Sequence, residues 1–122
     1  MKSVRATAAG LMAALTLLTF CLDRYCDAET KTPVITIHAK CYTFSPSEIT
    51  LKRGQEVKLV FVSDDVPHAV VVDGLGIDLN IENHRSSQVV ITPTETGDFK
   101  GRCSRYCGTG HSAMAFVVHV AN

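Results

Sequence analysis

Short runs of β-branched and aromatic residues, separated by turn-forming residues, make up the sequence from Val34 onward. In residues 34–41 apolar and polar side chains alternate, which is the period of a strand with one buried face. No later segment shows a convincing helical pattern. Seven or eight short strands separated by turns predict an all-β Greek-key sandwich or barrel. The expected strands are residues 34–41, 49–51, 56–62, 69–72, 77–81 (a strand or an irregular crossing), 88–92, 98–102 and 115–120.

The N-terminus has the pattern of an export signal. Lys2 and Arg5 precede an uncharged run at residues 6–22, and small residues follow up to Ala28. We therefore predict a signal peptide over residues 1–28, cleaved after Ala28, and one domain over residues 29–122.

Two alternatives remain for this segment. Its 17 uncharged residues are at the lower limit for a membrane span, so it is also compatible with a retained N-terminal anchor. Lipidation of Cys21 is less favoured because the bulky Phe20 precedes it. In each case the domain is expected outside the cytoplasmic membrane.

Charge and size exclude several classes of protein. The chain has 12 basic and 12 acidic residues and no Lys/Arg cluster, so nucleic acid is not an expected partner. A chain of 122 residues is also too short for a Rossmann enzyme with a separate substrate domain. Cleavage after Ala28 would leave three cysteines, Cys41, Cys103 and Cys107, an odd number that does not fit a disulfide framework.

The most specific indication of function in the sequence is the set of candidate metal ligands in residues 103–114. This stretch lies between two expected strands and has no carboxylate, and two glycines allow its backbone to reverse. Thiolate, thioether and imidazole groups together are ligands for copper rather than for calcium or magnesium. His68, in an upstream loop, offers a second imidazole. The donors within the stretch are Cys103, Cys107, His111 and Met114.

The spacing C-x3-C-x3-H-x2-M resembles the binuclear copper (CuA) domain of cytochrome c oxidase subunit II and nitrous oxide reductase. His68, three positions after Asp65, matches the D-x-x-H element of that family, and residues 44–46 and 53–57 are similar to the general cupredoxin framework. The resemblance covers residues 34–120 and implies a cupredoxin-like fold.

The resemblance implies two copper ions bridged by the thiolates of Cys103 and Cys107. One copper would also bind His111 and the backbone carbonyl of Arg105. The other would also bind His68 and the thioether of Met114. The resemblance also implies that Asp65 does not bind metal and instead forms a hydrogen bond within the His68 loop.

Two departures from the family matter. Oxidase members usually carry a Glu, part of a magnesium site, where this chain has Arg105. Their two-helix membrane hairpin and their Trp near the electron-transfer surface have no counterpart here. We therefore predict an exported carrier, free-standing or singly anchored, in the periplasm or at the outer face of the membrane. It would be a monomer when soluble, would exchange electrons with a c-type cytochrome or a terminal oxidase, and would perform no bond chemistry alone.

Other interpretations of the same residues stay open. Cys107, His111, Met114 and His68 suffice for a mononuclear blue-copper site, and the same ligands could deliver or store cuprous ion. Cys103 and Cys107 could form a disulfide, and a β-sandwich without metal is the remaining reading.

The remaining cysteine and histidines are predicted to be structural. Cys41 lies on the apolar face of its strand and is expected to be a buried, inert thiol. Its neighbour His38 lies on the opposite face of that strand. Tyr106 and Phe99 are expected to pack around the 103–114 loop. Three histidines, His38, His84 and His119, are expected at the surface.

Overall fold

The structure is a computed structural model and describes residues 31–122, so the predicted signal peptide lies outside the described residues. Within them the chain forms nine strands and one short 3-10 helix, η1 (His111–Ala113). The strands are β1 (Val34–Lys40), β2 (Thr43–Ser45), β3 (Glu48–Lys52), β4 (Val57–Ser63), β5 (His68–Val72), β6 (Ile77–Ile81), β7 (Ser86–Ile91), β8 (Gly97–Cys103) and β9 (Ala115–Ala121).

The predicted all-β fold is confirmed, but nine strands replace the expected seven or eight. The additional strand is β2, which has only three residues and pairs with the end of β1. Three residues are too few for alternation to be visible in a sequence. The segment at 77–81 is a regular strand that pairs with β5 along its whole length. No helix in the described residues is long and apolar enough to cross a membrane.

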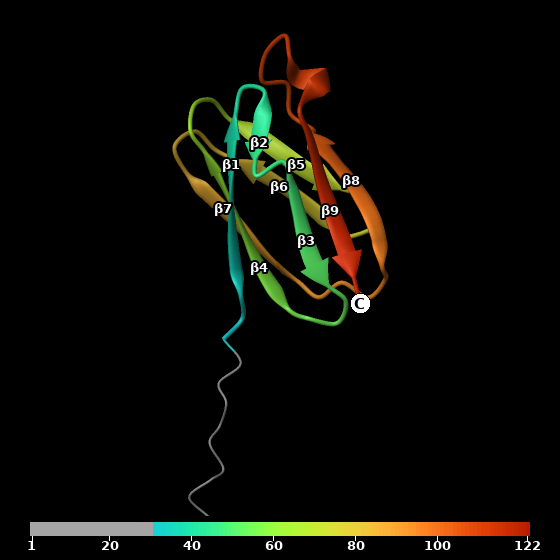
Figure 1. The fold of residues 1–122 in the computed structure, drawn as a ribbon. Coiled ribbons are helices and arrows are strands. Elements are labelled where there is room, and N and C mark those ends of the chain that lie inside the picture. The colour runs from blue at the N-terminus through green and yellow to red at the C-terminus, as the bar shows by residue number, and fades with distance from the viewer. Residues whose placement is uncertain (1–30) are drawn as a thin grey trace, which may run out of the picture. The chain divides into compact units, whose positions relative to one another are not determined.

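The strands form two sheets that pack face to face (Figure 1). One sheet has the order β2-β1-β4-β7 and the other the order β3-β9-β8-β5-β6. The pairs β1–β4 and β3–β9 are parallel, and the remaining pairs are antiparallel. Strands that follow one another in the chain therefore often lie in different sheets, as in a Greek-key sandwich.

The core lies between the two sheets. Ile37 and Ala39 of β1 are completely buried, as the alternation in residues 34–41 predicts. Three phenylalanines, Phe44, Phe61 and Phe116, meet with ring centroids 5.6–6.4 Å apart. Edge-to-face and tilted contacts of this kind add about 0.5–1.5 kcal/mol per pair beyond the burial of area. The small strand β2 therefore contributes a central core residue, Phe44.

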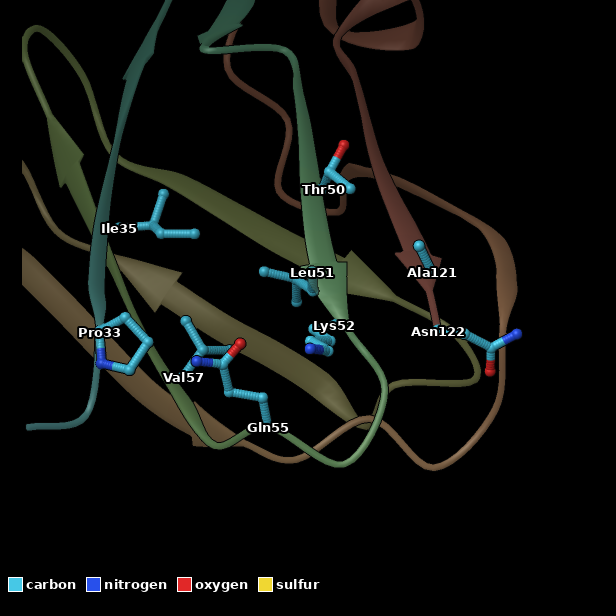
Figure 2. A pocket seen from close by; sticks show the side chains of 9 residues that line it. All are labelled: Pro33, Ile35, Thr50, Leu51, Lys52, Gln55, Val57, Ala121 and Asn122. Atoms are coloured by element: carbon cyan, nitrogen blue, oxygen red, sulfur yellow. The ribbon is translucent and has the colours of Figure 1, made fainter. Parts of the chain in front are cut away.

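Strand direction fixes which loops share an end of the sandwich. Figure 1 shows the β8–β9 loop at the same end as the β1–β2 turn, whereas β9 finishes at the other end. At that other end a hollow of about 390 Å³ opens between β1 and β3 (Figure 2). Ile35, Leu51 and Val57 line it, and it contains no cysteine or histidine. The chemistry-bearing residues are gathered at the opposite end.

Candidate metal centre

The loop between β8 and β9, residues 104–114, begins directly after Cys103 and ends at Met114. The Cys103 amide donates to the Met114 carbonyl at 3.1 Å, which closes the neck of the loop. The Ser104 amide donates to the Ala69 carbonyl at 3.2 Å and so ties the loop to β5. Both ends of this metal-ligand loop are therefore fixed by the sheet that carries His68.

Four of the six predicted metal ligands lie in this loop, and a fifth, Cys103, lies directly before it. The Cys107 Sγ lies 3.9 Å from the Cys103 Sγ, 3.9 Å from the His111 Nδ1 and 3.8 Å from the Met114 Sδ. The Cys103 thiol donates to the Arg105 carbonyl oxygen at 3.1 Å. Both thiols are free, and their separation exceeds the bond length of a disulfide, about 2.05 Å.

His68 joins these thiols from β5. One of its ring nitrogens and the sulfurs of Cys103 and Cys107 all lie within 4.8 Å of one another. The ring is completely buried, and its Nδ1 has no hydrogen-bond partner, the one such buried side-chain N or O atom among the described residues. Leaving a buried polar atom unpaired costs about 1–3 kcal/mol, so this nitrogen fits a metal ligand.

The carboxylate of Asp65 sets the state of the His68 ring. Its Oδ1 lies 2.7 Å from the His68 Nε2 and accepts from the Val66 amide at 2.7 Å, as the sequence predicted for this loop. Although burial opposes ionisation, hydrogen bonds from the Cys41 amide and then from His68 lower the pKa of Asp65. An ionised carboxylate only accepts hydrogen bonds, so the Nε2 of His68 is the donor in this pair, and in the neutral ring the lone pair is then on the Nδ1.

The thiols of Cys107 and Cys41 keep their protons when no metal is bound. Burial, followed by the proximity of Cys103, raises the pKa of Cys107 to about 12. Burial and the neighbouring carboxylate of Asp65 likewise raise the pKa of Cys41. A metal that binds these sulfurs must therefore displace protons.

The β1–β2 turn contacts both the metal-ligand loop and the loop before His68. The sequence did not reveal these contacts. Cys41 was expected to be a buried, inert thiol, but it is half-buried and its Sγ donates to the Cys107 carbonyl at 3.5 Å. Its amide donates to the Asp65 Oδ2 at 2.8 Å. The next residue, Tyr42, lies so close to Gly108 and Gly110 that a Cβ at either glycine would overlap its ring. The contacts join residues 24 and 66 positions apart, so no local pattern could show them.

The outer side of the metal-ligand loop is partly apolar. Tyr106 was expected to pack around the loop, but it is 74% exposed, and its ring lies beside the His111 ring at a centroid distance of 5.8 Å. Beside it lies a shallow hollow of about 300 Å³ lined by Val66, Pro67, Arg105, Tyr106, Cys107 and Gly108. The Arg105 side chain points to Glu82, with Nη1 to Oε1 at 3.0 Å, so only its carbonyl faces Cys103.

The other residues singled out in the sequence lie away from this centre. Phe99 was expected near the loop, but it packs beside Gly74 at the opposite end of β8. His38 is half-exposed, as predicted, and lies 2.9 Å from Asp64. His84 is also exposed. The partly exposed His119 contacts two carboxylates, at 2.6 Å from Asp98 and 3.1 Å from Glu48, an arrangement that its place in the sequence did not indicate.

Two sheets in this order, with cysteine, histidine and methionine side chains gathered in a loop at one end, define a domain of the cupredoxin class. A family match gives a finer assignment. The family described as the periplasmic domain of cytochrome c oxidase subunit II matches residues 38–121. The chain belongs to this family and is a CuA-type cupredoxin domain, and thus a copper-binding electron-transfer domain.

Individual relatives agree with this assignment. Cytochrome c oxidase subunit 2 of Artemia franciscana is 37% identical over 62 residues, which cover 51% of this chain and 27% of that protein. The chain thus spans about a quarter of the length of that relative. The periplasmic domain of oxidase subunit II of Bradyrhizobium japonicum has the same fold, with a TM-score of 0.68, 17% identity, and coverage of 74% and 84% of the two chains. A chain of a heme-copper terminal oxidase dimer also has this fold, with a TM-score of 0.67 and 20% identity. The match covers 88% of this chain and 92% of that chain.

Proposed function

We propose that this chain is an exported one-electron carrier with a binuclear copper centre of the CuA type. The observation that carries the proposal is the buried, unpartnered Nδ1 of His68 beside two free thiols. The proposed ligands are the side chains of His68, Cys103, Cys107, His111 and Met114 and the carbonyl of Arg105.

The donor set fits copper better than any hard cation. It consists of two thiols, one thioether and two imidazoles, which are soft or intermediate ligands, whereas hard cations prefer oxygen. Cys103 and Cys107 would hold the copper ions, and copper bound there would supply one-electron redox chemistry with little rearrangement of bonds. Three of the donor side chains, His68, Cys103 and Met114, are at most 2% exposed, which keeps water from that side of the centre.

The protein holds these donors in place before metal binds. His68 and Cys103 are strand residues whose backbones pair with neighbouring strands. Asp65 directs the Nδ1 lone pair of His68 away from itself by accepting from the Nε2. Because the ligands move little, the reorganisation that slows electron transfer is kept small.

Arg105 distinguishes this centre from that expected in an oxidase subunit. Its guanidinium pairs with Glu82, and a cation at that position cannot hold the neighbouring magnesium expected in oxidases. A monomer that exchanges electrons with a c-type cytochrome or a terminal oxidase fits this difference. We further propose that residues 1–28 are the export signal and that residues 29–122 are the mature domain. The periplasmic character of the family supports this location.

The test is the copper stoichiometry of the purified protein together with its electron paramagnetic resonance spectrum. Two coppers per chain, with one unpaired electron shared equally by both nuclei, are expected. One copper with its electron on a single nucleus would replace the proposal with a mononuclear site. A protein that binds only cuprous ion and gives it up to an acceptor domain would replace it with copper delivery.

A further inference from the structure

A third thiol lies against the proposed copper centre, outside its ligand set. The Sγ of Cys41, one carboxylate oxygen of Asp65 and one ring nitrogen of His68 all lie within 4.8 Å of one another. This second donor group shares His68 with the group formed by His68, Cys103 and Cys107. The two groups are therefore adjacent, with the same imidazole between them.

The two donor groups differ in their access to solvent. Cys103 is 2% exposed and Met114 is 1% exposed, whereas Cys41 and Cys107 are both half-buried. The Cys41 thiol contacts the backbone of Cys107 directly, at 3.5 Å from its carbonyl oxygen. A metal ion that approaches from solvent can thus meet Cys41 and Cys107 before it meets the buried sulfur of Cys103.

The shared ring also carries the unpartnered nitrogen. His68 is completely buried, and its Nδ1 has no hydrogen bond although its Nε2 has one. Cuprous ion binds well to two or three soft donors. The Cys41 thiol lies beside this ring and against Cys107, so it is a suitable first ligand.

We propose that Cys41 is a copper-uptake residue that binds incoming cuprous ion and passes it to Cys107. This inference rests on the proposed copper function. Cys41 loses its thiol proton to solvent when its sulfur bonds to Cu(I). A sulfur–copper bond to Cys107 then forms as the bond to Cys41 breaks, while Cys107 releases its proton and Cys41 takes one up. Copper remains cuprous throughout, so the transfer requires neither an oxidant nor a reductant.

The substitution Cys41→Ser isolates the sulfur. Serine keeps the amide that donates to Asp65 and supplies a hydroxyl that can donate to the Cys107 carbonyl, but it lacks the soft ligand. Cys41→Ala keeps the amide and removes both the sulfur and the side-chain donor. A comparison of the two variants separates copper uptake from support of the loop.

The experiment follows transfer of Cu(I) from its bicinchoninate complex to the metal-free protein by stopped-flow absorbance, without oxygen. We expect both variants to slow transfer about tenfold, the lower end of the effect of losing one partner of a metal site. Both should still reach two coppers per chain and the wild-type resonance spectrum after oxidation. That endpoint tests the proposed function separately, because the wild-type protein must reach it whatever Cys41 does.

Three results would overturn the inference. Equal transfer rates in the wild type and Cys41→Ser would exclude an uptake role for the sulfur. Slow transfer in Cys41→Ala alone would mean that Cys41 only supports the loop. A third copper in the wild type that is lost in Cys41→Ser would make Cys41 a permanent ligand of a separate site.

Discussion

The proposed copper ligands divide into a strand-borne half and a loop-borne half. His68 and Cys103 lie within β5 and β8 and are buried, whereas Cys107 and His111 lie in the loop and are half-buried. Backbone pairing to neighbouring strands fixes the first two, since His68 is opposite Ile81 and Cys103 is opposite Val70. The loop-borne pair depends instead on contacts with the β1–β2 turn. Strand pairing thus places one half of the ligands, and packing of one loop against another places the other half.

The largest expected effect comes from removing a donor of the strand-borne half. Cys103→Ser takes away one of the two thiols that would bridge the metals, so the protein should hold at most one copper per chain. Metal analysis and electron paramagnetic resonance would measure this. Ser104→Ala, a change at the exposed neighbour, is the control and should keep both coppers. An unchanged spectrum in Cys103→Ser would defeat the binuclear assignment.

The loop-borne half can be tested by disrupting the packing of the metal-ligand loop against the β1–β2 turn. Gly110→Ala places a Cβ in the Tyr42 ring, and such overpacking should destabilise the metal-free protein by about 1–3 kcal/mol in urea unfolding. In a Tyr42→Ala background the same change should cost almost nothing, because the ring is absent.

Gly108→Ala is the matched control for this pair. Its φ of +137° disfavours any other residue, so it should remain destabilising in both backgrounds. Equal costs of Gly110→Ala with and without Tyr42 would show that the ring does not support the loop.

A smaller effect is expected from a change that keeps copper bound. Met114→Leu replaces a weak thioether ligand by a hydrocarbon, which stabilises the oxidised state less, so the reduction potential should rise by about 60 mV, a tenfold change in the redox equilibrium. Protein-film voltammetry would measure the shift, with metal analysis beside it. Complete loss of copper would assign Met114 a much stronger role than an axial ligand.

The smallest expected effect lies away from both halves. Hydrogen bonds from His119 to Asp98 and then to Glu48 raise the pKa of His119. A raised pKa means that the protonated ring stabilises the folded state fully below its unfolded pKa, about 6.5, and that this contribution disappears as pH rises through the folded pKa.

The variant His119→Gln tests this contribution. It should lower the urea midpoint relative to the wild type at pH 6 but much less at pH 9, and leave the copper spectrum unchanged. A difference between the two proteins that does not depend on pH would exclude the ionic contribution.

The sequence predicted the fold class and the donor spacing because both are local patterns. Alternation in residues 34–41 identified the buried face of β1, and the spacing of Cys103, Cys107, His111 and Met114 identified the loop. His68 was recognised as a second available imidazole, but its meeting with the two thiols required the pairing of β5 with β8.

The residues that hold the metal ligands in position could not be predicted in this way. Cys41 looked like one more apolar residue of its strand, because its partners Asp65 and Cys107 are far away in the sequence. Tyr42 gave no signal either, since its contact with two glycines depends on how the β1–β2 turn meets the loop. Side chains that bind metal have recognisable chemistry, whereas those that position them are ordinary residues in particular places.

The direction of the outer strands bears on how such a domain can be attached to something else. β1 starts, and β9 finishes, at the end of the sandwich that carries the apolar hollow, while the metal-ligand loop lies at the other end (Figure 1). A tether joined before Val34 or after Ala121 would therefore connect to the side remote from Tyr106 and His111. The domain can be tethered through either terminus while the end that carries the metal-ligand loop stays open to a partner.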